Sequence, residues 1–128
     1  MNLSVLIVDD EAMTRNLLRL MLERTGLRIF EAADGVEALA VVAQEKPDML
    51  ILDVMMPNMD GITVCERLRA QEETAELPIV LLSARTSPEA VRMGMAAGAT
   101  KYVGKPVGRA EITSLVQELL VDFPQATN

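Results

Sequence analysis

The carboxylates best placed for chemistry are Asp9, Asp10 and Asp53. Asp9 and Asp10 directly follow a short, mostly apolar run at residues 3–8, and Asp53 directly follows another at residues 49–52. Runs this short are typical of strands buried on both faces of a parallel sheet. Three carboxylates in one cleft would repel each other, and a hard divalent cation is the usual remedy. Oxygen ligands without His or Cys favour Mg²⁺ or Mn²⁺ over zinc.

Two further residues could complete a site for phosphoryl transfer. Ser83 follows the apolar run at residues 78–82, and Lys105 comes shortly after the run at residues 100–103. An aspartate beside a divalent cation can attack phosphorus and become an aspartyl phosphate. The phosphoryl oxygens then need positive charge and hydrogen-bond donors, which Lys105 and Ser83 can supply. Each residue alone has an ordinary explanation, but their shared position at strand ends favours one site.

The elements that must position these residues alternate along the chain. Strands are predicted at residues 3–8, 28–32, 49–53, 78–82 and 100–103, and helices at about 12–24, 36–45, 61–70 and 87–97, with a last helix around 112–120. This alternation predicts an α/β fold, a flavodoxin-like doubly wound sheet of five parallel strands with helices on both faces. In the strand order 2-1-3-4-5 the first and third strands are neighbours, so Asp9, Asp10 and Asp53 meet in one cleft. Ser83 and Lys105 leave the fourth and fifth strands at the same edge.

The size of the chain, 128 residues, allows one domain with one core. We expect this domain to cover residues 1–122, with residues 123–128 as a tail or the start of a linker. Aromatic residues make up only 2% of the chain, so the interior must be filled by Leu, Val, Ala and Met. Most of the nine Met are therefore expected to be packing residues.

The charge and composition exclude several classes of partner and compartment. A net charge of −7 and a pI of about 4.6 argue against direct binding to nucleic acid or to an anionic membrane. A single cysteine, Cys65, excludes an internal disulfide framework and fits a buried thiol. The sequence opens without a basic region and has no apolar run of about 18 residues, so neither export nor a membrane span is indicated. The expected location is the cytoplasm.

The motifs together resemble the receiver domain of two-component response regulators, in particular the single-domain, chemotaxis-type regulators. The matching segments are Ile-Val-Asp-Asp-Glu at residues 7–11, Asp-Met-Leu-Ile-Leu-Asp-Val-Met-Met-Pro at 48–57 with Asp-Gly at 60–61, Leu-Ser-Ala at 82–84 and Gly-Lys-Pro at 104–106. The resemblance extends from about residue 3 to residue 120, and the motifs together are highly specific.

The resemblance implies a phosphoacceptor signalling domain, which is not a conventional enzyme but catalyses its own Mg²⁺-dependent phosphorylation and dephosphorylation. Asp53 matches the phosphoacceptor of the family. Asp10, Asp53 and the backbone carbonyl of Met55 match the Mg²⁺ ligands, and Asp9 matches a residue that acts through water.

The same resemblance assigns roles to residues of the later strands. Ser83 and Lys105 match the phosphoryl-binding pair, and Tyr102 matches an aromatic switch residue that works with Ser83. On phosphorylation the Ser83 hydroxyl is expected to move toward the phosphoryl group and Tyr102 to turn inward. Met55 and Arg85 occupy positions that modulate dephosphorylation in the family. A cis peptide bond is expected before Pro106.

The phosphoryl donor implied by the resemblance is a phosphohistidine on a sensor histidine kinase or a phosphotransfer protein. Because this chain contains no His, the donor must be another molecule. A downstream effector protein or domain would read the result. The sequence carries no effector domain, so we expect either a stand-alone regulator or a receiver taken from a longer one.

Three alternatives remain to be weighed. A phosphatase of the haloacid dehalogenase type needs a second Asp two residues after the first, where this chain has Met55, and a flavodoxin-like FMN site would be repelled by the acidic residues 9–11. The more serious alternative is a non-phosphorylated pseudo-receiver that acts only as an interaction module.

Two departures from the family also stand out. Thr100 and Lys101 replace acidic residues that winged-helix regulators use in dimer contacts, and Gly108 replaces a better helix cap.

Overall fold

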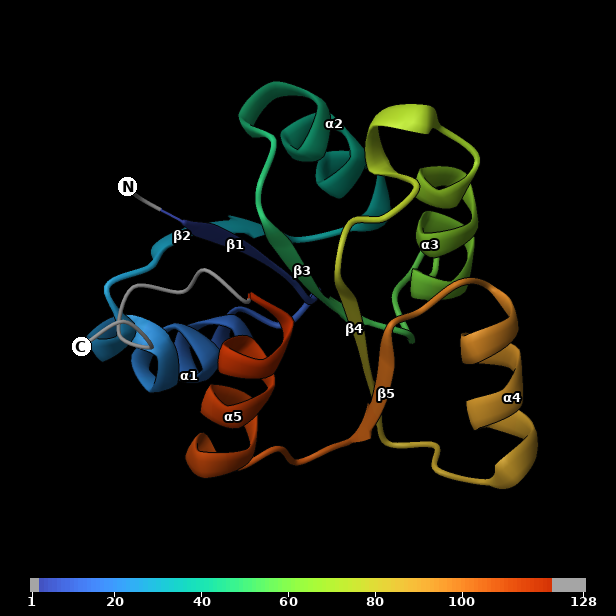
Figure 1. Cartoon of the computed structure of the whole chain (residues 1–128). Coiled ribbons are helices and arrows are strands. Elements are labelled where there is room, and N and C mark those ends of the chain that lie inside the picture. Colours follow the sequence, from blue (N-terminus) through green and yellow to red (C-terminus); the bar gives the residue numbers. More distant parts are fainter. Residues whose placement is uncertain (1–2, 121–128) are drawn as a thin grey trace.

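Five parallel strands form a single sheet in the order β2-β1-β3-β4-β5 (Figure 1). The structure, a computed structural model, describes residues 3–120 of the chain. The strands are β1 (Ser4–Val8), β2 (Arg28–Ala32), β3 (Met49–Asp53), β4 (Ile79–Ser83) and β5 (Lys101–Gly104). The predicted strand order is therefore confirmed, and each predicted strand lies within about one residue of its expected bounds.

Helices cover both faces of the sheet, as the alternating pattern predicted. They are α1 (Ala12–Leu22), α2 (Gly35–Glu45), α3 (Gly61–Arg69), α4 (Pro88–Ala96) and α5 (Arg109–Leu119). Figure 1 shows α1 and α5 on one face and α2, α3 and α4 on the other. Two short 3₁₀ segments are also present: η1 (Glu23–Thr25) follows α1, and η2 (Glu72–Thr74) lies between α3 and β4. None of the helices within residues 3–120 is long and apolar enough to cross a membrane.

The two faces of the sheet support two separate apolar clusters. Because successive side chains of a strand point to opposite faces, alternate residues of the same strand enter different clusters. In β1, Val5 and Ile7 pack toward α1 and α5, whereas Leu6 and Val8 pack toward α2 and α3. This burial on both faces explains why the central strands have no polar face.

Helix starts follow the local signals of the sequence. Ser87 precedes Pro88 and caps α4 by accepting a hydrogen bond from the backbone nitrogen of Ala90. Asp60 caps α3 in the same way by accepting from the backbone nitrogen of Thr63. Gly108 begins α5 without a side-chain cap, which agrees with the weak cap expected there.

One sequence-based expectation about packing needs correction. Met13, Met55, Met93 and Met95 are exposed, so the expectation that most Met residues fill the interior was wrong for these four. Composition alone does not show which apolar side chains the fold covers. The predicted tail from residue 123 lies outside the described residues.

Candidate functional site

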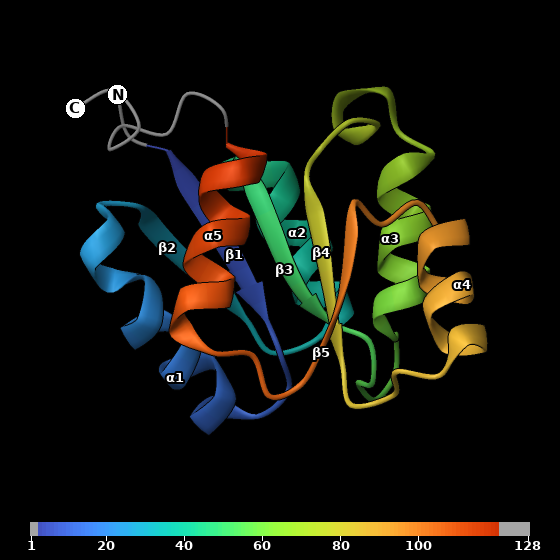
Figure 2. The same ribbon diagram turned by 60° about the horizontal axis from the view of Figure 1, so that its bottom comes forward.

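The three predicted carboxylates meet at the carboxyl-terminal edge of the sheet. Figure 2 shows the neighbouring strands β1 and β3 running to this edge. Val8 of β1 pairs with Leu52 of β3, so the residues that follow them, Asp9 and Asp53, lie side by side. Asp9, Asp10 and Asp53 each place a carboxylate oxygen within 4.8 Å of the others. Asp9 and Asp53 are buried, with 1% and 5% of their surfaces exposed, whereas Asp10 is exposed. The predicted convergence of these carboxylates is confirmed.

Lys105 reaches this cluster from the end of β5. Its Nζ atom lies 2.9 Å from Oδ2 of Asp9 and 3.0 Å from Oδ1 of Asp53. Its backbone nitrogen donates a 2.9 Å hydrogen bond to the carbonyl oxygen of Ser83, which extends the β4–β5 pairing to the site. The peptide bond between Lys105 and Pro106 is cis, as expected. One ammonium group is thus shared by two buried carboxylates.

The electrostatics of the site reflect this sharing. Burial raises the pKa of the Asp53 carboxyl above its ordinary value; the hydrogen bond from Lys105 opposes this rise, and the charge of Asp9 adds to it. Burial disfavours the charged form of Lys105, but its bonds to Asp9 and Asp53 outweigh this effect and raise its pKa. A lysine held in its charged form neutralises one of two buried negative charges. The site therefore has room for further positive charge.

A hollow of about 280 Å³ opens directly over this cluster. Its lining residues come from the ends of four strands, β1, β3, β4 and β5: Asp10, Glu11, Asp53, Met55, Ala84 and Lys105. Sequence reasoning missed Glu11 and Ala84 as lining residues, although their position next to Asp10 and Ser83 could have indicated them. The backbone nitrogen of Glu11 also donates a 2.9 Å hydrogen bond to Oδ1 of Asp9, which helps to fix that carboxylate.

The loop after Asp53 folds back closely on the strand end. The backbone nitrogen of Gly61 donates a 2.9 Å hydrogen bond to the carbonyl oxygen of Val54. A side chain at position 61 would collide with the carbonyl group of Asp53, so only glycine allows this approach. Gly61 therefore allows the loop that carries Met55 to lie close against the end of β3.

The predicted switch residues are joined through a backbone segment. Ser83 is fully buried, and its Oγ atom accepts a 3.0 Å hydrogen bond from the backbone nitrogen of Arg85. The carbonyl oxygen of Arg85 accepts a 2.6 Å hydrogen bond from the hydroxyl of Tyr102. The side chain of Arg85 is exposed and does not line the hollow, whereas Met55 does. The backbone of Arg85, which sequence reasoning overlooked, is thus the link between Ser83 and Tyr102.

Comparison with known proteins agrees with this geometry. The family model of the response regulator receiver domain matches residues 5–117. The chain belongs to this family. It is a receiver domain of the kind found in the response regulators of two-component signalling systems.

Relatives of this receiver domain are longer response regulators. The chain is 42% identical over 120 residues to the response regulator MprA of Mycobacterium ulcerans, and the matched region covers 94% of this chain and 51% of that protein. It is 41% identical over 120 residues to the alkaline phosphatase synthesis transcriptional regulatory protein PhoP of Bacillus subtilis, covering 94% and 49%. The chain therefore spans about half the length of the curated relatives it matches.

Solved structures of receiver proteins share the fold closely. A putative response regulator from Chloroflexus aurantiacus superposes with a TM-score of 0.90 at 37% identity, covering 94% of this chain and 99% of that one. The receiver domain of the sensor histidine kinase PA1611 from Pseudomonas aeruginosa superposes with a TM-score of 0.87 at 27% identity, with the same coverage. That domain has a magnesium ion coordinated in its active-site cleft.

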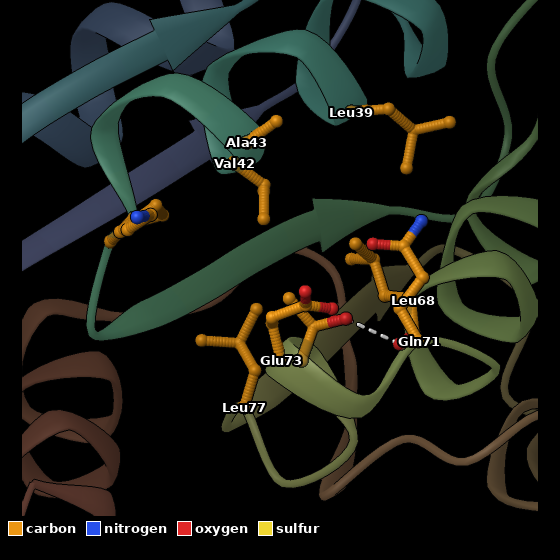
Figure 3. A pocket seen from close by; sticks show the side chains of 10 residues that line it. Leu39, Val42, Ala43, Leu68, Gln71, Glu73 and Leu77 are labelled. Atoms are coloured by element: carbon orange, nitrogen blue, oxygen red, sulfur yellow. Dashed lines mark hydrogen bonds between the residues drawn. The ribbon is translucent and has the colours of Figure 1, made fainter.

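A second hollow of the receiver domain lies at the opposite edge of the sheet. Its volume is about 550 Å³. Figure 3 shows Leu39 and Val42 of α2 on one side of it, and Leu68 and Leu77 on the other. None of the residues predicted to do chemistry lines it. Its size alone gives no reason to place the phosphoryl chemistry there, because the acidic cluster lies at the other edge.

Proposed function

We propose that this receiver domain accepts a phosphoryl group on Asp53 from a phosphohistidine of a partner protein. The observation that carries the proposal is the shared ammonium group of Lys105, which lies within 3.0 Å of both Asp9 and Asp53. Asp53 opens into the hollow, so a donor can approach it although most of the carboxylate is buried. This geometry suits a nucleophile with a fixed cation beside it. No residue of the site favours the non-phosphorylated alternative.

The proposed reaction moves one phosphoryl group between two side chains. A carboxylate oxygen of Asp53 forms a bond to phosphorus as the bond between phosphorus and the donor's imidazole nitrogen breaks. The imidazole takes up a proton, and Asp53 becomes an acyl phosphate. Lys105 already contacts Asp53 and would bind one of the negatively charged phosphoryl oxygens. The Ser83 hydroxyl would donate a hydrogen bond to another phosphoryl oxygen.

The donor set of the site fits Mg²⁺, with Mn²⁺ as a possible substitute. Three carboxylates lie together, and Lys105 pairs with two of them, so the cluster keeps excess negative charge that an oxygen-bound divalent cation would neutralise. Asp10, Asp53 and the backbone carbonyl of Met55 would hold the ion, with Asp9 acting through water. When bound, the ion would supply positive charge to the phosphoryl oxygens. The magnesium ion in the related PA1611 receiver domain supports this assignment.

The same site would also remove the phosphoryl group. Water attacking phosphorus would release inorganic phosphate and restore the Asp53 carboxylate. Met55 is half-exposed at the hollow and would hinder that water directly. The Arg85 side chain extends from the loop after Ser83 and would act from the solvent side. Both residues are proposed to set the lifetime of the phosphorylated form.

The proposed partners follow from the family. A sensor histidine kinase or phosphotransfer protein would supply the phosphoryl group, since the chain has no His, and an effector protein or domain would read the change at Ser83 and Tyr102. The acidic charge of the chain makes nucleic acid and anionic membranes poor direct partners. We place the domain at residues 1–122 and its function in the cytoplasm.

Incubation with acetyl phosphate and Mg²⁺, followed by intact-mass analysis, tests this proposal. We expect the added mass of one phosphoryl group on the native chain and none on an Asp53→Asn variant, which changes the shape of the residue very little. A native chain that gains no mass under these conditions would contradict the proposal and favour an interaction module.

A further inference from the structure

The ring of Tyr102 lies in a slot on α4 that exists because residue 94 has no side chain. A Cβ atom built on Gly94 would lie 2.6 Å and 2.8 Å from Cδ2 and Cε2 of Tyr102, and 3.1 Å from Cδ1 of Leu81. Carbon atoms in normal contact are about 3.5–4.0 Å apart. Any other residue at position 94 must therefore push the Tyr102 ring away.

The backbone gives no reason for glycine at position 94. Among the described glycines only Gly26 and Gly98 have positive φ angles, so the conformation of Gly94 suits any residue. A glycine inside a helix costs about 0.5–1 kcal/mol relative to alanine. Gly94 is the buried residue of α4, and it faces the Tyr102 ring. Its role is therefore one of packing against Tyr102.

A second glycine supports the same arrangement. Gly104 and Tyr102 are two residues apart in β5, so they lie on the same face of that strand. A Cβ atom on Gly104 would lie 2.7 Å from Cγ2 of Thr86. The loop between β4 and α4 therefore rests on β5 at Gly104 while the Tyr102 hydroxyl holds the carbonyl oxygen of Arg85.

The hydrogen bonds of this loop lead to the Ser83 hydroxyl. Tyr102 fixes the carbonyl group of Arg85, and the amide nitrogen of the same residue donates to Oγ of Ser83. A hydroxyl that accepts from an N–H keeps its own proton for another acceptor. The arrangement thus leaves the Ser83 proton free for a phosphoryl oxygen and restricts the directions in which it can point.

We propose that Gly94 is a positioning residue for phosphoryl transfer, acting through Tyr102 and the Arg85 backbone on the Ser83 hydroxyl. The inference rests on the proposed function, because Ser83 matters here only if Asp53 is phosphorylated. A Cβ at position 94 turns the Tyr102 ring out of its slot and breaks its bond to Arg85. The loop from Ala84 to Ser87 then loses its anchor, and Ser83 loses its fixed orientation.

Gly94→Ala separates this role from an ordinary helix effect, because the two predict different results for the phosphorylation rate. Helix propensity alone makes alanine stabilising, with the melting temperature raised and phosphorylation unchanged. The slot predicts instead that the initial rate of phosphorylation by acetyl phosphate falls roughly two- to tenfold, the range for losing one positioning hydrogen bond. Tyr102 is the only tyrosine and the chain has no Trp, so its fluorescence reports the ring directly. We expect stronger acrylamide quenching in the variant.

Two further variants control the experiment. Tyr102→Phe removes the hydroxyl but keeps the ring, and should slow phosphorylation to a similar extent. Adding Gly94→Ala to it should cause little further loss, because both changes break the same link. Gly108→Ala is the matched control, since nothing lies within 4 Å of a Cβ at that position, and it should leave quenching and phosphorylation unchanged.

The outcomes distinguish this inference from the proposed function. A native chain that takes no phosphoryl group overturns both. If the native chain is phosphorylated and Gly94→Ala matches it in rate and in quenching, only the positioning role of Gly94 is overturned. Slower phosphorylation with unchanged quenching also overturns it, since the ring would then not be the link.

Discussion

The ammonium nitrogen of Lys105 lies 3.0 Å from Oδ1 of Asp53, and less than a quarter of the lysine side chain is exposed. The same nitrogen also contacts Asp9, so removing it leaves two buried carboxylates without their shared cation. Losing one partner of a buried ion pair costs about 3 kcal/mol or more. This relationship makes Lys105 important for stability as well as for chemistry.

We therefore predict that Lys105→Met lowers the free energy of unfolding by about 3 kcal/mol in the presence of a chelator. Urea denaturation checks this. The control is Lys101→Met, whose ion pair with Glu118 is largely exposed and should contribute less than about 1 kcal/mol. Equal losses of unfolding free energy in the two variants would contradict the claim that the buried ion pairs of Lys105 stabilise the fold more than an exposed ion pair does.

Mg²⁺ should stabilise the native chain, because it binds a crowded acidic site that only the folded state forms. Thermal unfolding should show a melting temperature that rises with millimolar-scale Mg²⁺. Asp10→Asn should remove most of this response, because it takes away one carboxylate and relieves repulsion. Asp34→Asn, which keeps the cap of α2, is the control and should respond like the native chain. A melting temperature indifferent to Mg²⁺ in the native chain would refute the metal site.

Glu31 gives a prediction for pH dependence away from the site. Hydrogen bonds from Arg19 and, less strongly, from Arg15 hold the pKa of Glu31 below its ordinary value, although burial opposes them. A depressed folded-state pKa adds stability that is present above the unfolded pKa and is lost as the pH falls through the folded pKa. Glu31→Gln should thus destabilise the chain at neutral pH, and the difference should shrink below about pH 4.3.

Denaturation at neutral and acidic pH measures this difference between the native chain and Glu31→Gln. Glu76→Gln, at an exposed position in the loop before β4, is the matched control and should show little difference at either pH. A Glu31→Gln effect that stays the same size across the acidic range would contradict the role of the ionised carboxylate.

Shortening Met55 and Arg85 should change the lifetime of the phosphorylated form. Met55 lines the hollow over Asp53, and Arg85 lies in the loop after Ser83. Under the proposed function both residues act on the water that would attack the phosphoryl group. We predict that Met55→Ala combined with Arg85→Ala alters the decay rate of the phosphorylated form severalfold. Intact-mass measurements after removal of acetyl phosphate follow this decay. Met13→Ala, an exposed change on α1, should leave the rate alone. An unaltered rate in the double variant would remove both residues from the mechanism.

Much of the fold could be predicted because short apolar runs alternate along the chain with helical patterns. A parallel sheet then brings the ends of β1, β3, β4 and β5 to one edge, which places Asp9, Asp53, Ser83 and Lys105 together. This step needs no knowledge of side-chain contacts. The clustering of the site was therefore accessible from strand order alone.

The remaining features depend on contacts that no periodicity contains. Sequence spacing does not show that Lys105 touches Asp9 as well as Asp53, because that depends on where a long side chain ends. It also does not show that the Arg85 backbone, rather than its side chain, joins Ser83 to Tyr102. Such links arise from the close packing of a loop on β5.

The most direct test of the account is to locate the phosphoryl group. The chain is phosphorylated with acetyl phosphate and Mg²⁺ and then treated with borohydride, which reduces an aspartyl phosphate to homoserine, and peptide mass analysis finds the altered position. We predict homoserine at position 53 only, and none after Asp53→Asn. Stable phosphate on Ser83 or Thr86, or homoserine at Asp9 or Asp10 instead, would contradict the assignment of Asp53 as the phosphoacceptor.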